Sequence, residues 1–140
     1  MILYLDSSSA VKLYVEEADS ADVERIVEAA DRVSSSRIAY AEIRAAVAAA
    51  WRAGRLAEQS YRRLVQAFDG DWRRYIRVSP SEAVIRLAGS LAEKHGLRGY
   101  DAVHLASALS LKNLTLEDVS FSSRDQDLSN AASAEGLALV

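Results

Sequence analysis

The sequence predicts an α/β fold in which helices cover both faces of a short, mostly parallel central sheet. Short apolar segments alternate along the chain with longer segments of helical character, which is the order expected of βαβ units. The apolar segments also lack the alternation of polar and apolar residues that a half-exposed strand shows. We therefore expect strands that are buried on both faces.

The first predicted element is a strand over Ile2–Leu5, because four apolar residues run directly into a carboxylate. A helix is expected over Ser7–Glu17, with Ser7 or Ser8 near its N-cap, since serine side chains accept hydrogen bonds from free backbone N–H groups. A second helix is predicted over Asp19–Ala30, because its apolar residues recur on one face.

A short strand around Val33 is expected next. Ser36 then precedes a long helix and is its predicted N-cap. This helix is expected to end near Ala53, because Gly54 follows and glycine commonly terminates helices. Another helix is predicted over Leu56–Trp72, whose aromatic and aliphatic residues repeat with helical spacing.

In the second half of the chain, Tyr75–Val78 is predicted to form a short strand. The segment after it has the features of a helix start. Ser79 would cap the helix, Pro80 would occupy its first position, and Glu82 would complete a capping box. The helix is expected to end at His95, because a glycine follows.

The remaining elements complete the alternation. Tyr100–Leu111 is predicted to be an apolar helix, and Val119–Ser122 a strand. Asp125–Glu135 is predicted to be a short helix, and Leu137–Val140 a last strand. The chain, residues 1–140, is long enough for one domain with a hydrophobic core of its own.

Composition excludes several classes of protein. The chain has no cysteine, which rules out disulfides and thiolate metal sites. No apolar run approaches the roughly 18 residues of a membrane span, and no basic segment precedes a long apolar stretch at the N-terminus. We therefore expect a cytoplasmic protein that does not enter a membrane.

Positive charge is concentrated in arginine. The chain has 14 arginines and 3 lysines at a net charge of −3, and seven of the arginines lie from Arg52 to Arg77. The planar guanidinium group suits phosphate oxygens, so this segment is suited to contact a nucleic acid. The alternative is that these arginines form the solvated faces of helices.

Four acidic residues stand out by their positions. Asp6 follows the first predicted strand and Asp125 lies just past the strand Val119–Ser122, so both belong to the carboxyl edge of the sheet, where ligands of such folds bind. Glu42 and Asp101 lie in helical stretches that are otherwise nearly uncharged. We expect Asp6 and Asp125 to meet at one rim of the sheet, and Glu42 and Asp101 to face other parts of the protein.

Each acid also has an ordinary structural explanation when it is taken alone. Asp6 would cap the first helix, and Asp101 would cap a helix or place a favourable charge near its N-terminus. Glu42 would form a salt bridge with Arg44 or Arg98, or belong to a solvent-exposed stripe. These alternatives stay open for any single residue.

Together, four carboxylates at one rim would repel one another. Each like-charge pair costs about 3 kcal/mol at about 5 Å with an effective dielectric constant near ~20. Protons, arginines or a hard divalent cation would relieve this repulsion, and an all-oxygen ligand set suits Mg²⁺ or Mn²⁺. Zinc is disfavoured, because only His95 and His104 are available, and His104 is expected to be packed or hydrogen-bonded.

Four segments carry a resemblance to a known family. The order DSSSAVKLYV, SRIAYAEIRAA, GLRGYDAVHLASAL and FSSRDQDL resembles the PIN-domain ribonucleases, and within them the toxin component of VapBC toxin–antitoxin pairs. The resemblance covers essentially the whole chain, and the stretch DAVHLASAL is its most specific part. It implies a PIN-like three-layer α/β/α sandwich, with residues 1–140 forming a single PIN domain.

The resemblance also implies the site residues. The family's acidic pocket, which binds Mg²⁺ or Mn²⁺, is matched by Asp6, Glu42, Asp101 and Asp125. Ser7 would touch a metal-bound water, and Ser123 precedes Asp125 by two residues, as a serine or threonine does in the family. Asp127 leaves a second register open, although the spacing from Ser123 favours Asp125.

The implied activity is metal-dependent hydrolysis of RNA by a toxin. The implied partners are an RNA substrate, a cognate VapB-type antitoxin protein and a second copy of the chain in a homodimer. Arg98, Arg62 and Arg63 are predicted to contact RNA phosphates. Two other classes stay open: a PIN-like binding module without catalysis, and a phosphoaspartate-type phosphotransfer domain. The latter needs an Asp-x-Asp motif or an acidic pair with a catalytic lysine, and the chain has only Lys12, Lys94 and Lys112.

Overall fold

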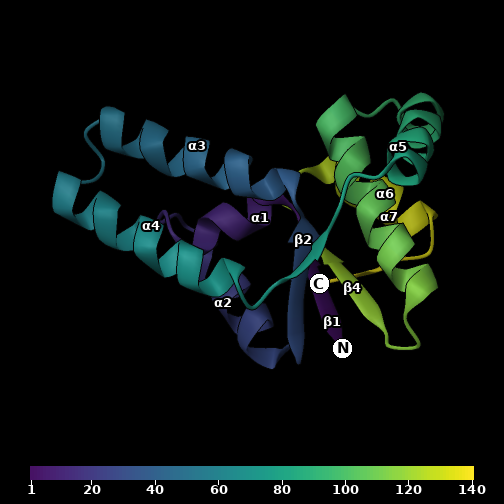
Figure 1. Ribbon diagram of the computed structural model, residues 1–140, viewed down its shortest axis with the longest axis horizontal. Coiled ribbons are helices and arrows are strands. Elements are labelled where there is room, and N and C mark those ends of the chain that lie inside the picture. The colour runs from purple at the N-terminus through teal and green to yellow at the C-terminus, as the bar shows by residue number, and fades with distance from the viewer.

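A computed structural model describes residues 1–140 and contains a five-stranded sheet in the order β3-β2-β1-β4-β5 (Figure 1). All four neighbouring strand pairs are parallel, which confirms the predicted α/β fold. The strands are β1 (Ile2–Leu5), β2 (Arg32–Ser36), β3 (Ile76–Val78), β4 (Val119–Ser122) and β5 (Ala138–Leu139). The helices are α1 (Ser7–Ala10), followed by the 3₁₀ turn Val11–Leu13, α2 (Ser20–Ala29), α3 (Ile38–Arg52), α4 (Glu58–Trp72), α5 (Glu82–His95), α6 (Gly99–Leu114) and α7 (Gln126–Ala134).

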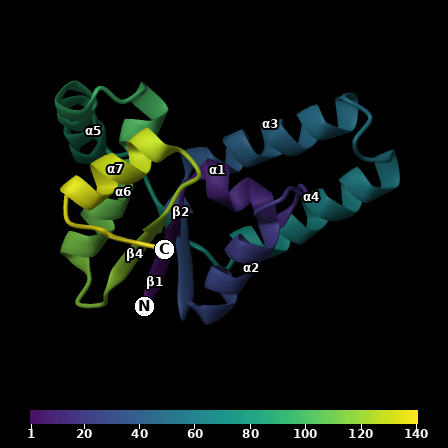
Figure 2. The same ribbon diagram turned by 180° about the vertical axis from the view of Figure 1, so that it is seen from behind.

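Helices cover both faces of the sheet, as the apolar strands predict. Successive side chains of β1 point to opposite faces. Ile2 and Tyr4 belong to a hydrophobic cluster with residues of α5, α6 and α7, whereas Leu3 and Leu5 belong to a second cluster with residues of α1 to α4. Figures 1 and 2 show these two groups of helices on either side of the strands. The chain is therefore a three-layer α/β/α sandwich.

The hairpin of α3 and α4 projects beyond the edge of the sheet (Figures 1 and 2). Aromatic side chains join its two helices near the sheet. The ring of Tyr40 stacks on that of Phe68 with 5.4 Å between centroids, and Trp72 lies 5.6 Å from Tyr40. Near the tip, Trp51 stacks on Tyr61 at 4.5 Å.

Every helix of the structure is too short or too polar to span a membrane.

The sheet topology creates a natural ligand site beside β1. The chain first builds β1, β2 and β3 outward in one direction, and then returns to add β4 and β5 on the other side of β1. In open α/β sheets, ligands bind outside the carboxyl ends of the strands where the order reverses. Here that point lies between β1 and β4, which are followed by Asp6 and Ser123.

Several predicted helix boundaries are wrong. The first helix ends at Leu13 rather than Glu17, because the chain leaves the helical conformation at Tyr14 (φ −121°, ψ −28°) and buries that ring edge-on against Phe68. The N-cap of α5 is Ser81 rather than Ser79, since the Ser81 hydroxyl accepts from the backbone N–H of residue 84. Tertiary packing decides the end of the first helix, and a competing local cap decides the start of α5. Ser36 is not the N-cap of α3, because the strand β2 continues through it and Arg37 is the N-cap. The helix predicted over Tyr100–Leu111 is also longer, from Gly99 to Leu114.

Candidate active site

Asp6 lies at the end of β1 and is almost completely buried, with 2% of its surface exposed. The hydroxyl of Ser8 lies 2.8 and 2.9 Å from its two carboxylate oxygens. The backbone N–H of Ser9 donates to Oδ1 over 2.9 Å, and the hydroxyl of Ser123 donates to Oδ2 over 2.7 Å. Asp6 is therefore the N-cap of α1, and its oxygens are fixed by donors from β4's end as well as from its own helix.

Burial raises the pKa of Asp6 above its ordinary value, although hydrogen bonds from Ser123, Ser9 and Ser8 oppose the shift. None of these three donors carries a charge. The ionised carboxylate therefore lacks a cation within hydrogen-bonding distance. A bound metal ion would supply that charge and favour the ionised form.

Glu42 projects from α3 and is held by a histidine of α6. Its Oε1 lies 2.7 Å from Nε2 of His104, whose Nδ1 lies 2.9 Å from the hydroxyl of Tyr4. The alternative of a salt bridge between Glu42 and Arg44 or Arg98 is not observed, because Arg44 donates to a tyrosine and Arg98 pairs with other acids. His104 is packed and hydrogen-bonded, as expected, and only 1% exposed.

Arg98 bridges the other two carboxylates. Its Nε donates to Oδ2 of Asp101 over 3.2 Å, and its Nη2 lies 3.6 Å from Oδ2 of Asp125. Asp125 also caps α7, because its Oδ1 accepts from the backbone N–H of Leu128 over 2.9 Å. Asp127 is exposed and makes no contact with the pocket, so Asp125 is the acid of this segment that faces the other carboxylates.

The four carboxylates line one pocket of about 310 Å³ at the carboxyl edge of the sheet. They come from four separate parts of the chain: the end of β1, α3, the start of α6 and the N-cap of α7. The lining residues are Asp6, Ser7, Ser8, Val11, Glu42, Ala46, Arg98, Asp101 and Asp125. No three histidine or acidic side chains lie close enough to form a preassembled metal centre. A cation would therefore have to draw the carboxylates together.

The donor set of this acidic pocket fits a hard divalent cation. Its polar lining consists of carboxylates, serine hydroxyls and one guanidinium group, and oxygen ligands are those that Mg²⁺ and Mn²⁺ prefer. All three lysines bind groups outside the pocket: Lys12 contacts Glu17, Lys94 contacts Glu135, and Lys112 contacts a backbone carbonyl. The acidic pocket therefore lacks the catalytic lysine that the phosphoaspartate alternative would place beside an acidic pair.

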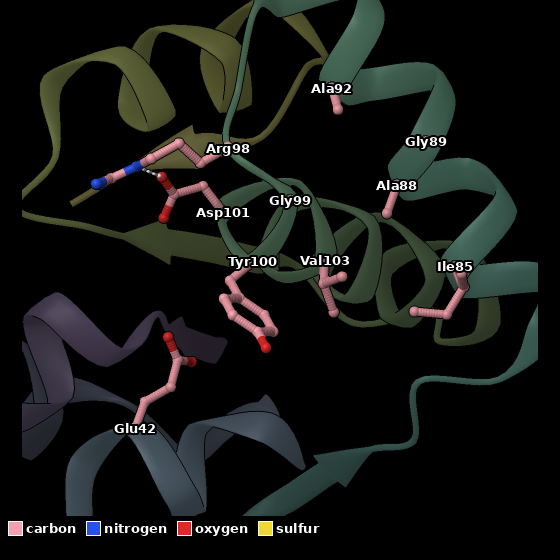
Figure 3. Close-up of a pocket in the computed structure, with 10 residues that line it drawn as sticks. All are labelled: Glu42, Ile85, Ala88, Gly89, Ala92, Arg98, Gly99, Tyr100, Asp101 and Val103. Carbon is pink, nitrogen blue, oxygen red and sulfur yellow. Dashed lines mark hydrogen bonds and ion pairs between the residues drawn. The ribbon is translucent and has the colours of Figure 1, made fainter. Parts of the chain in front are cut away.

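A larger, mostly apolar pocket of about 640 Å³ adjoins the acidic pocket and shares Glu42, Arg98 and Asp101 with it. Figure 3 shows the ring of Tyr100 beside the pair of Arg98 and Asp101, with Glu42 facing them from α3. Tyr100 is 70% exposed, and Ile85 of α5 is also exposed. The carboxylates are thus bordered by an open surface with an accessible aromatic ring.

Three serines near Asp6 test the sequence reasoning. Ser7 lines the pocket but makes no side-chain hydrogen bond, and Ser123 donates to Asp6. Ser8, which contacts both Asp6 oxygens, was not among the predicted site residues. Its signal in the sequence is a hydroxyl two residues after an aspartate, a spacing typical of local side-chain turns.

The predicted RNA-contacting arginines lie in different places. Arg98 lines both pockets, whereas Arg62 and Arg63 are exposed on α4 and line neither. Arg62 pairs with Glu58 one turn earlier in the helix, over 2.9 Å. Their contact with RNA stays a prediction.

The sequence matches the family model of the PIN domain over residues 3–133. It is 40% identical over 110 residues to Ribonuclease VapC45 and to Ribonuclease VapC49, from two strains of Mycobacterium tuberculosis. Each match covers 79% of this chain and 76% of the relative.

Solved structures share the fold at lower sequence identity. FitAcB from Neisseria gonorrhoeae superposes with a TM-score of 0.68 at 20% identity, covering 99% of this chain and 96% of that chain. VapBC2 from Rickettsia felis, bound to a DNA fragment from its promoter, gives a TM-score of 0.66 at 14% identity and covers 100% and 98%. A toxin–antitoxin complex from Klebsiella pneumoniae gives 0.67 at 15% identity, covering 91% and 90%.

Proposed function

Because the chain belongs to the PIN-domain family, we propose that it is a ribonuclease that depends on Mg²⁺ or Mn²⁺ and acts as the toxin of a toxin–antitoxin pair. The observation that supports this most strongly is the meeting of four carboxylates, each from a different part of the chain, around one pocket. The curated relatives are ribonucleases by name.

The metal ligands in this proposal are Asp6, Glu42, Asp101 and Asp125. When bound, a divalent ion lowers the pKa of a coordinated water and neutralises charge on the scissile phosphate. Asp6 suits the role of a fixed ligand, because neutral donors hold its oxygens without cancelling its charge. Ser7, whose hydroxyl is free of other partners, would hydrogen-bond to water in the pocket.

The remaining residues of the pocket would manage protons and phosphate. The carboxylate of Asp101 or Asp125 would accept the proton of the attacking water, since both line the pocket and are only partly buried. Arg98 would turn from these acids toward a phosphate of the RNA. Its side chain is 83% exposed, so this movement meets little steric resistance.

The substrate in this proposal is a single-stranded or looped segment of RNA, because unpaired bases can be splayed out and contacted. The exposed ring of Tyr100, next to the acidic pocket, offers a surface on which such a base can stack. Arg62 and Arg63 would contact phosphates farther along the strand.

The partners are part of the same proposal. We expect a cognate antitoxin protein to cover the acidic pocket with a basic side chain, because the carboxylates attract a cation in the absence of metal. The toxin is expected to act in the cytoplasm and to form homodimers.

Expression of the protein alone should arrest growth, and co-expression of the antitoxin should relieve the arrest. Unchanged growth and RNA profiles at high expression would contradict the toxin assignment.

Cleavage of a labelled single-stranded RNA by the purified protein tests the enzymatic part. We expect cleavage with Mg²⁺ or Mn²⁺, none in EDTA, and a large loss in Asp125→Asn. Asp127→Asn is the matched control, because Asp127 lies two residues away but is exposed and outside the pocket. Equal loss in both variants, or cleavage that persists in EDTA, would contradict the proposal.

A further inference from the structure

A buried series of hydrogen bonds leads from Tyr4 of β1 through His104 to Glu42 in the acidic pocket. Tyr4 is 0% exposed and His104 is 1% exposed. The Tyr4 hydroxyl lies 2.9 Å from Nδ1 of His104, and Nε2 of His104 lies 2.7 Å from Oε1 of Glu42. We propose that His104 is a positioning residue that sets Glu42 for metal binding. This inference rests on the proposed function.

The direction of the hydrogen bonds follows from the chemistry of the groups. The carboxylate of Glu42 can only accept a hydrogen bond, so Nε2 of His104 must carry a proton. In the neutral imidazole Nδ1 is then an acceptor, and the hydroxyl of Tyr4 donates to it. Glu42 therefore selects the tautomer of His104 with the proton on Nε2, and the hydroxyl of Tyr4 complements that tautomer by donating to Nδ1.

The hydrogen bonds among Tyr4, His104 and Glu42 link the elements that supply three of the four acids. Tyr4 lies on β1 two residues before Asp6, His104 lies on α6 three residues after Asp101, and Glu42 lies on α3. A shift of α3 relative to α6 would break the bond between His104 and Glu42. These hydrogen bonds thus fix the position of Glu42 relative to β1 and α6, the elements of Asp6 and Asp101.

Only one oxygen of Glu42 is used in this arrangement. Oε1 faces His104, whereas Oε2 makes no hydrogen bond within the chain and is left for a ligand in the pocket. No arginine competes for Glu42, since Arg44 and Arg98 are bound to other groups. Groups that hydrogen-bond to the other oxygen of a metal-binding carboxylate orient the carboxylate and raise metal affinity.

Two substitutions of His104 separate positioning from packing. In His104→Gln the side-chain amide can reach the place of Nε2 and keep the donor to Glu42, whereas in His104→Asn the shorter side chain cannot. We expect His104→Asn to weaken Mn²⁺ binding, measured by titration calorimetry, by about 10- to 100-fold. His104→Gln should stay within about threefold of the parent, because restoring the donor rescues the position of Glu42.

A double-mutant cycle shows whether the effect acts through Glu42. In a Glu42→Gln background, His104→Asn should change Mn²⁺ affinity by less than about twofold, because the group it positions is already altered. Tyr4→Phe provides a further variant that removes only a hydroxyl and keeps the ring stacked on Phe121. It should weaken Mn²⁺ binding in the same direction as His104→Asn.

The outcomes distinguish this inference from the function on which it rests. Equal Mn²⁺ affinity in the parent, His104→Asn and Tyr4→Phe would overturn the inference alone, as would equal weakening by the Gln and Asn variants of His104. A parent protein that binds no Mn²⁺ and cleaves no RNA would overturn the proposed function and the inference together. Mn²⁺ binding that weakens with Asn, recovers with Gln and loses its dependence on His104 in the Glu42→Gln background supports it.

Discussion

The acidic pocket has two pairs of carboxylates that are held in different ways. Asp6 and Glu42, the hydrogen-bonded pair, are held by serine hydroxyls, a backbone N–H and a buried histidine. Asp101 and Asp125, the arginine-bridged pair, are held by Arg98, whose side chain is 83% exposed.

An acidic site can therefore be stable without metal and still bind a cation. The hydroxyl and backbone donors around Asp6 carry no charge, so they fix its carboxylate and leave its negative charge available to a metal ion. Arg98 instead relieves the repulsion between Asp101 and Asp125 with its own positive charge. Because an exposed ion pair contributes only about 0.2–1 kcal/mol, a divalent ion can replace it at low cost.

The largest effect is expected from Asp101→Asn, which removes one charge from the arginine-bridged pair and keeps the size of the side chain. RNA cleavage should fall at least about 100-fold, equivalent to about 2.7 kcal/mol of transition-state stabilisation. Stability in EDTA should stay within about 1 kcal/mol of the parent, because the lost ion pair is exposed and one like-charge repulsion is also removed. Single-turnover cleavage and thermal melts measure the two quantities.

A structural salt-bridge network makes the opposite forecast for Asp101→Asn. Removing one member of a buried pair leaves the other unpaired and costs about 3–5 kcal/mol. Marked destabilisation in EDTA, together with cleavage that survives and does not respond to EDTA, would reject the metal site.

The hydrogen-bonded pair is tested by the pH dependence of stability without metal. Burial raises the pKa of Asp6, so the folded protein binds this proton more tightly than the unfolded chain does. The resulting stability is present at low pH and is lost as the pH rises through the raised value, above the ordinary value of about 4. Asp6→Asn removes this loss and keeps an N-cap acceptor.

We therefore expect the melting temperature of the parent in EDTA to fall as the pH rises over this window, and that of Asp6→Asn to fall less. The comparison uses the difference between the two proteins at each pH, so other titrating groups cancel. A difference that stays constant from about pH 4 to pH 8 would show that Asp6 has no raised pKa in the folded state.

Arg98→Gln tests the role of the arginine in the arginine-bridged pair. If Arg98 occupies the place of the metal's charge, its removal should tighten Mn²⁺ binding by up to about fivefold, the equivalent of about 1 kcal/mol. RNA binding should weaken at the same time. Arg86→Gln on α5 is a matched control, because Arg86 also forms an ion pair, with Glu82 at 2.9 Å, but lines neither pocket. Weaker Mn²⁺ binding in Arg98→Gln would contradict the replacement of Arg98 by metal.

The smallest effect is expected outside the pocket. Changing Arg62 and Arg63 together to glutamine should reduce the slope of log affinity for single-stranded RNA against log salt by about 1.4, if both contact phosphates. Stability should change by less than about 0.5 kcal/mol, since both side chains are exposed. Arg25→Gln on α2 serves as the control, and a salt slope equal to that of the parent would show that the α4 arginines form only a solvated surface.

Sequence reasoning predicted the parts of the site that depend on local pattern. The strands Ile2–Leu5 and Val119–Ser122 follow from apolar runs, and their bounds agree with β1 and β4. The expectation that Asp6 and Asp125 meet at one edge follows from the rule that parallel strands end on the same side. Both residues line the acidic pocket.

The contacts that were not predicted join distant residues. Glu42 and His104 are 62 positions apart, and nothing local to either residue indicates that an imidazole rather than an arginine meets the carboxylate. The bridge of Arg98 to Asp125 likewise depends on how α6 and α7 pack against the sheet. Local pattern thus gives the elements, whereas side-chain pairing depends on how the sheet brings the ends of α3, α6 and α7 together at its carboxyl edge.

Thermal unfolding of the parent in EDTA and in saturating Mn²⁺ tests most directly whether the pocket is a metal site. At 100 times the dissociation constant, a ligand that binds only the folded state stabilises it by about 2.7 kcal/mol, which is roughly 5–10 °C for a protein of this size. We predict a rise of this order for the parent and for Asp127→Asn, and little or none for Asp6→Asn combined with Asp101→Asn. No rise in the parent, or an equal rise in the combined variant, would contradict the account.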